Sequence, residues 1–184
     1  MTKTFWAYGA FGWLVVSFVW HVWMGVDYRA AMGAEDAVPV WGFLAYDGLI
    51  VAMSAGGAVV SLAAVRPWGR RLPGWLVTVP LWCGAGLLTV RGVPGLVEDL
   101  TTVTGLTPYG LLGLAEHPAD PASGEFWAGM AINAYFFVGA VLMLPLAVLH
   151  QRGRATVTEP RGGTARARGR RRTAQRTGQE KSAA

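Results

Sequence analysis

The sequence has a single cysteine, Cys83, and no Cys-x-x-Cys pair, which excludes an intramolecular disulfide and dithiol redox chemistry. It also lacks a His-Glu-x-x-His motif, a glycine-rich phosphate loop and a nucleophile with an adjacent base. The turn that carries Glu116, His117 and Asp120 is a pattern common by chance and does not predict a metal site. We therefore assign no catalytic residue, metal or cofactor, and an enzyme is the least favoured class of function.

Charge is also scarce: 15% of the residues are charged, 53% are hydrophobic and nine are tryptophan, which is typical of a membrane protein. Apolar runs cover about 5–26, 41–65, 74–93 and 126–149. Each is about 20 residues long, enough for a helix to cross the hydrocarbon core, and none alternates like a barrel strand. The sequence thus predicts an all-α fold, a four-transmembrane-helix bundle in residues 1–150. The first run is too long and too rich in tryptophan for a signal peptide, so we expect it to be retained.

Residues 151–184 form a basic tail. They contain ten Lys or Arg and two Glu, a net charge of +8, whereas residues 1–150 have six basic and nine acidic groups, a net charge of −3. The tail has no apolar periodicity, so we expect it to be disordered. It is either a ligand for anionic lipid headgroups or simply a solvated topology anchor; it does not resemble a folded nucleic-acid module. The arginines expected to contact headgroups are Arg166, Arg168, Arg170, Arg171 and Arg172.

The connections between the apolar runs differ in the sign of their net charge. Arg66, Arg70 and Arg71 lie between the second and third runs, whereas segments 27–40 and 94–125 carry eight acidic residues and one arginine. The positive-inside rule therefore predicts a multi-pass protein of the cytoplasmic membrane with both termini in the cytoplasm.

One polar residue in each run is predicted to lie near the outer boundary. At 1.5 Å per residue, Asp47 is about 9 Å deep, His21 about 7–8 Å and Asn133 about 10 Å, and Arg91 lies at the surface. Alone, each has an ordinary structural explanation, such as a bond to a neighbouring helix. Together they predict an outer-leaflet polar cluster in which Asp47 is paired with Arg91 or His21.

Two further features concern helix packing. Gly48, Ala52 and Gly56 recur at four-residue spacing and predict a smooth stripe for close approach of another helix, on a face shared with Asp47. Trp13, in mid-membrane, is expected to pack rather than to bind a cofactor.

Two predictions concern the segment that follows the third run. Pro94 is predicted to end the third helix, and a short interfacial helix is expected around 96–104. The long external connection of which it is part could cap the polar cluster.

The third run, "GWLVTVPLWCGAGLLTVRG", its external loop and "FWAGMAINAYFFVGAVLMLPLA" resemble a family of small four-span bacterial membrane proteins with no assigned function. The resemblance covers the second half of the membrane domain and implies four spans and no particular activity.

Two functional hypotheses follow. The first is a non-enzymatic membrane protein that associates with itself or with a partner protein and anchors a basic cytoplasmic tail. The second is a small transporter or sensor that binds a small ligand or a proton at the polar cluster.

Overall fold

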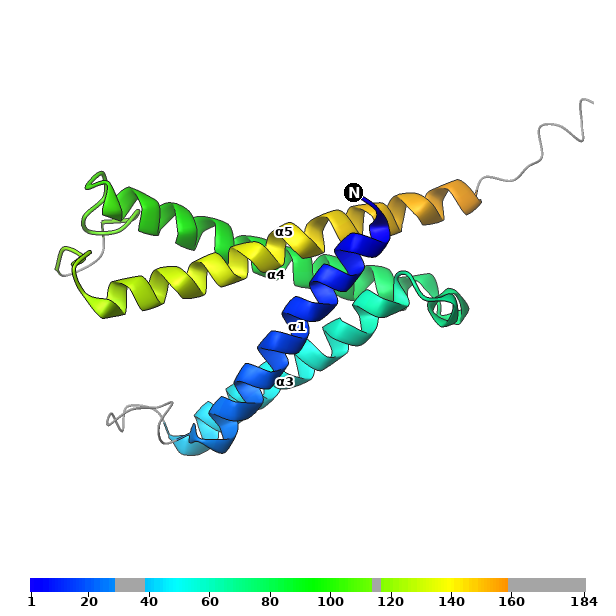
Figure 1. Cartoon of the computed structure of the whole chain (residues 1–184), viewed down its shortest axis with the longest axis horizontal. Coiled ribbons are helices and arrows are strands. Elements are labelled where there is room, and N and C mark those ends of the chain that lie inside the picture. The colour runs from blue at the N-terminus through cyan, green and yellow to red at the C-terminus, as the bar shows by residue number, and fades with distance from the viewer. Residues whose placement is uncertain (29–38, 114–116, 159–184) are drawn as a thin grey trace, which may run out of the picture. The chain divides into compact units, whose positions relative to one another are not determined.

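The structure, a computed structural model, describes residues 1–28, 39–113 and 117–158. Its elements are α1 (Lys3–Val26), α3 (Val40–Ala63), the short 3-10 helix η1 (Pro67–Arg71), α4 (Gly74–Val103) and α5 (Gly124–Thr158) (Figure 1). The four α-helices are long and apolar enough to cross a membrane. The all-helical class and the four apolar helices are therefore confirmed, and they favour a multi-pass membrane protein.

The four long helices share one apolar core, built largely from small side chains that let helices approach closely. We call the end of the domain at Lys3 and η1 the terminal end, and the end where α1 and α4 finish and α3 and α5 begin the loop end. Most of the core belongs to the half nearer the terminal end, and its members are Ala7, Ala10, Leu14, Ala58, Ala63, Ala64, Val77, Leu81, Ala85, Met143, Leu146 and Ala147.

The prediction that Pro94 ends the third helix is wrong, because α4 continues to Val103. Proline removes only one N–H donor from a helix, and the residues beyond it keep theirs. Carbonyl groups at the new end are also bonded, since Thr101 accepts from the backbone N–H groups of Leu106 and Thr107, and Thr102 accepts from that of Gly105. The short helix predicted around 96–104 is thus the last part of α4 rather than a separate element.

The last helix is also longer than its apolar run, since α5 extends to Thr158. The start of the predicted tail is therefore helical rather than disordered, because a helix does not need apolar residues once its earlier turns are formed. Internal contacts divide the chain into Met1–His150, which contains three of the four spans and most of the fourth, and Gln151–Ala184. Residues 159–184, with the five arginines predicted to contact headgroups, lie outside the described residues.

Candidate functional site

The carboxylate of Asp47 is bonded to His21. The Nδ1 atom of His21 on α1 lies 2.7 Å from Oδ1 of Asp47 on α3, and the two side chains are 21% and 5% exposed. Gly25 leaves room for the second carboxylate oxygen, since a Cβ atom at position 25 would lie 2.9 Å from Oδ2. This pair, the His21–Asp47 pair, joins α1 to α3 near the loop end.

Arg91 and Asn133 form a polar contact between α4 and α5 toward the same end. The Nη1 group of Arg91 donates to Oδ1 of Asn133 (2.5 Å), and Nδ2 of Asn133 donates to Oδ2 of Asp99 (2.7 Å). The guanidinium carbon of Arg91 also lies 5.3 Å from the ring centroid of Phe136. Sequence reasoning missed Asp99 because it ended the helix at Pro94. The spacing of Arg91, Gly95 and Asp99 would have placed all three on one helical face.

The four polar residues predicted as one cluster are therefore joined as two separate pairs. Within the described part of the chain, the side-chain hydrogen bond of Asp47 leads to His21 and that of Arg91 leads to Asn133. Each pair bridges two helices that are packed together, α1 with α3 and α4 with α5. Of the two partners predicted for Asp47, the structure places His21 beside it.

The α1 and α3 contact contains a second polar pair. Ser54 Oγ donates to Ser17 Oγ at 3.0 Å, and both residues are buried. Ser17 lies one helical turn from His21, and Ser54 two turns from Asp47, so the two pairs lie along the same contact. Sequence reasoning missed these serines, although their spacing from His21 and Asp47 was visible.

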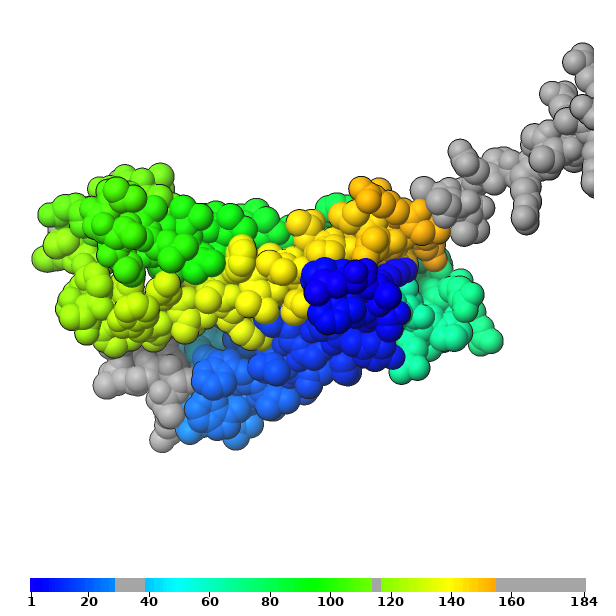
Figure 2. Space-filling view, turned by 45° about the horizontal axis from the view of Figure 1, so that its top comes forward, coloured from blue at the N-terminus to red at the C-terminus, as the bar shows by residue number. Residues whose placement is uncertain are grey.

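Trp13 and Tyr135 hold α1 against α5, and Figure 2 shows these two helices (blue and yellow) in direct contact. Trp13 Nε1 donates to the carbonyl of Tyr135, and the Tyr135 hydroxyl donates to the carbonyl of Trp13, both at 3.1 Å. The rings are stacked with centroids 4.6 Å apart. Gly139 makes room, since a Cβ atom there would lie 2.6 Å from the indole ring. The structure thus places Trp13 in a packing contact; nothing in the sequence singled out Tyr135.

The small-residue stripe on α3 is exposed. A Cβ atom at Gly48 or Gly56 would meet nothing within 4 Å, and Ala52 is also exposed. The expectation that Gly48 and Asp47 share a face is wrong, because consecutive residues diverge by about 100° around a helix and Asp47 is buried.

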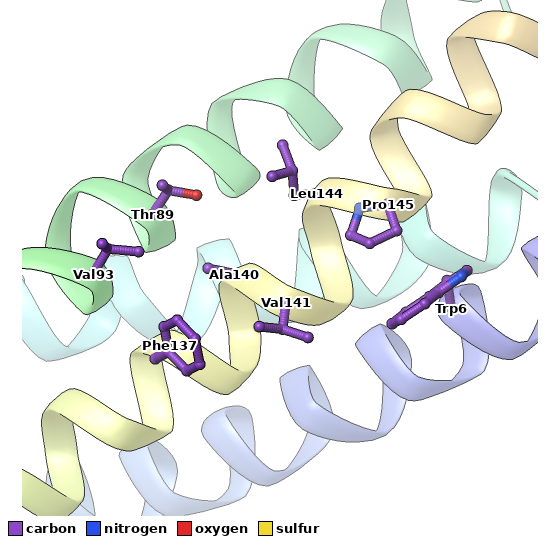
Figure 3. Close-up of a pocket in the computed structure, with 8 residues that line it drawn as sticks. All are labelled: Trp6, Thr89, Val93, Phe137, Ala140, Val141, Leu144 and Pro145. Carbon is purple, nitrogen blue, oxygen red and sulfur yellow. The ribbon is translucent and has the colours of Figure 1, made fainter. Parts of the chain in front are cut away.

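A groove of about 290 Å³ lies beside α5 (Figure 3), and His21, Asp47, Arg91 and Asn133 are not among its lining residues. Side chains from three helices line it: Trp6 of α1, Thr89 and Val93 of α4, and Phe137, Ala140, Val141, Leu144 and Pro145 of α5. The lining is almost entirely apolar. Among the described residues, no group of three or more His, Cys, Asp or Glu side chains is placed to hold a metal ion.

Comparisons with protein-family models, curated proteins and solved structures give no match. The resemblance of the second half of the domain to small four-span bacterial proteins therefore stays a prediction.

Proposed function

We propose that the protein is a non-enzymatic integral membrane protein of the cytoplasmic membrane, whose four-span domain anchors a basic cytoplasmic tail and serves as an interaction module. The observation that carries this proposal is the use of the polar side chains within the spans. His21, Asp47, Arg91 and Asn133 all bond a neighbouring helix, and the groove beside α5 is apolar. Polar residues used in this way stabilise helix packing.

The proposed orientation is supported by the distribution of charge between the two ends. The terminal end carries Lys3 and the arginines of η1, and Arg66 lies 5.7 Å from the ring centroid of Tyr8. The loop end carries acidic side chains, among them Glu98 and Asp99. An excess of Lys and Arg marks the cytoplasmic side.

The orientation is tested with reporter fusions placed after residues 35, 70, 118 and 160 of the chain. We expect the reporters to indicate outside, inside, outside and inside, because the arginine-rich connection and tail resist translocation. An external signal at 160 would contradict the proposed orientation and the tail's cytoplasmic role with it.

The tail is proposed to bind anionic lipid headgroups, because each Lys or Arg near an anionic surface contributes about 1 kcal/mol. The full chain in nanodiscs of phosphatidylcholine should capture vesicles that contain phosphatidylglycerol and not vesicles of phosphatidylcholine alone. Capture should fall as salt shortens the Debye length from about 8 Å at 0.15 M to about 3 Å at 1 M. It should also fall when five tail arginines are replaced by glutamine: Arg166, Arg168, Arg170, Arg171 and Arg172.

The matched control replaces the same five arginines by lysine, which keeps the charge and should keep the capture. Equal capture of neutral and anionic vesicles, or equal loss in the glutamine and lysine variants, would contradict electrostatic binding and leave the tail as a topology anchor.

The exposed stripe of Gly48, Ala52 and Gly56 is the face of α3 on which we propose that a second copy or a partner helix packs.

A second candidate function, a transporter or sensor for a proton or small ligand, is favoured by one observation. The His21–Asp47 pair is a carboxylate and an imidazole within apolar helices, with His21 still 21% exposed. Ionisable residues in such positions often mark ion or proton sites.

A further inference from the structure

The connection between α3 and α4 carries three exposed arginines whose guanidinium groups keep their hydrogen-bond donors. Arg66 precedes η1, and Arg70 and Arg71 are its last two residues. Among the described residues, no carboxylate lies within ion-pair distance of these three side chains, and they donate no hydrogen bond. A guanidinium has five N–H donors and binds phosphate in a bidentate manner. The connection can therefore bind an anion without breaking an existing hydrogen bond.

The acidic side chains among the described residues lie in the other half of the domain. They belong to the loop end or to the turns of the long helices nearest to it: Asp27, Asp47, Glu98, Asp99, Asp120 and Glu125. The terminal end carries Lys3 in addition to the three arginines. Because no described carboxylate at the terminal end balances this positive charge, the terminal end attracts anions from its surroundings.

The connection is short and is packed against the end of α3. Only residues 64–73 separate α3 from α4. Gly69 of η1 is buried, and a Cβ atom at this position would overlap the carbonyl oxygen of Ala63, the last residue of α3. Since both flanking helices are long and apolar enough to cross a membrane, η1 lies at the membrane boundary. Its arginines are thus held in the headgroup layer, which is about 5–8 Å thick on each side of the hydrocarbon core.

Aromatic side chains accompany the arginines. Trp68 is 41% exposed and shares a face of η1 with Arg71, because residues three apart eclipse each other in a 3-10 helix. Trp75, in the first turn of α4, is 64% exposed. The guanidinium of Arg66 lies over the ring of Tyr8, which leaves the N–H groups at its edge able to donate. Tryptophan and tyrosine favour the boundary between hydrocarbon and water, so the connection has the composition of a surface in contact with headgroups.

We propose that the connection between α3 and α4 binds the headgroups of anionic phospholipids, with Arg66, Arg70 and Arg71 contacting phosphate. The lipids belong to the leaflet at the terminal end, which in the proposed orientation is the cytoplasmic leaflet. Net charge selects the occupant, because a zwitterionic headgroup carries its own cation beside the phosphate. The site rests on the proposed insertion in a membrane, which the reporter fusions test separately, and it does not depend on the tail.

The test uses the full chain in which the five tail arginines are already replaced by glutamine, so that the tail contributes little. Native mass spectrometry in mild detergent measures the lipid retained after addition of phosphatidylglycerol or phosphatidylcholine of identical chains. The chain should prefer phosphatidylglycerol, and Arg70→Gln should reduce this preference about fivefold, the effect of one cation near an anionic surface. The matched control, Arg29→Gln, removes one cation from the connection predicted on the opposite side and should leave the preference unchanged.

A pair of triple variants separates charge from folding. Glutamine at positions 66, 70 and 71 should abolish the preference for phosphatidylglycerol, whereas lysine at the same positions keeps the charge and should retain most of the preference. The readout in detergent does not depend on the orientation of the chain in a membrane, so a change of topology in the cell cannot mimic the result. Inorganic phosphate should displace the lipid no more than chloride does at equal ionic strength, because the proposed occupant is a lipid headgroup and not the free ion.

Three results would overturn the proposal. Equal retention of the two lipids would leave this basic surface to an acidic protein partner instead of a lipid. Equal effects of Arg70→Gln and Arg29→Gln would show a dependence on total charge and no site. Equal loss of preference in the glutamine and lysine triple variants would show a change in folding. Each measurement is made in a chain that already lacks the tail arginines, so this site and the proposed tail function fail independently.

Discussion

Replacing Gly92 by valine is expected to separate α4 from α5 near the loop end and to destabilise the protein strongly. A Cβ atom at position 92 would lie 2.5 Å from the backbone nitrogen of Phe137 and 2.7 Å from the carbonyl carbon of Phe136. These are backbone atoms, which cannot rotate away as a side chain can. Overpacking commonly costs about 1–3 kcal/mol, and a collision with backbone belongs at the upper end or beyond.

The measurement is the free energy of unfolding in detergent, with Gly86→Val as the matched control. Gly86 lies on the same helix, and a Cβ atom there would meet nothing within 4 Å. Both variants make the same change in helix propensity, so their difference reports the contact with α5 alone. If the two substitutions have the same effect, α4 and α5 do not approach as closely as the structure shows.

The same substitution should disturb the polar contact next to it. Arg91 precedes Gly92, and a Cβ atom at Gly95 would lie 2.6 Å from Oδ1 of Asn133, so the Arg91 and Asn133 pair depends on glycine at both positions. The hydrogen bonds between α4 and α5 therefore depend on the close approach of these two helices. Both glycines are visible in the sequence, but only the position of α5 reveals that Gly92 makes room for backbone and Gly95 for side chains.

The positions of the four apolar helices could be predicted because hydrophobic length alone determines which segments are able to cross a bilayer. The end of α4 could not be predicted in the same way, because proline weakens a helix by an amount that tertiary contacts can offset. For this reason the predicted site did not include Asp99.

Contacts between helices were predicted only in part. Depth counting placed His21 at the level of Asp47, and the structure places these two side chains 2.7 Å apart. It placed Arg91 at a similar level, but depth contains no information on which helix lies beside which. The contact of Trp13 with Tyr135 depends on Gly139, a third residue whose role appears only when two helices are packed together.

The second large effect is expected at the His21–Asp47 pair, and the two single substitutions should differ. His21→Ala removes the hydrogen-bonding partner of a carboxylate that is 5% exposed, whereas Asp47→Ala leaves an imidazole that is 21% exposed and able to reach polar surroundings. Leaving a buried neutral group without its hydrogen-bonding partner costs about 1–3 kcal/mol and a carboxylate more, so His21→Ala should cost at least the upper end of that range. Asp47→Ala should cost less, about 1–3 kcal/mol for the loss of the hydrogen bond.

The double variant should be milder than the sum of the two, with a coupling energy of about 1–3 kcal/mol between residues in direct contact. The matched control is the cycle of Asp47→Ala with Arg91→Ala, which should show coupling below about 0.5 kcal/mol because Arg91 bonds Asn133 instead. Coupling of Asp47 to Arg91 as strong as to His21 would restore the single polar cluster that depth counting predicted. Coupling to His21 alone, in a double variant that remains folded, would identify the carboxylate as a bond between α1 and α3.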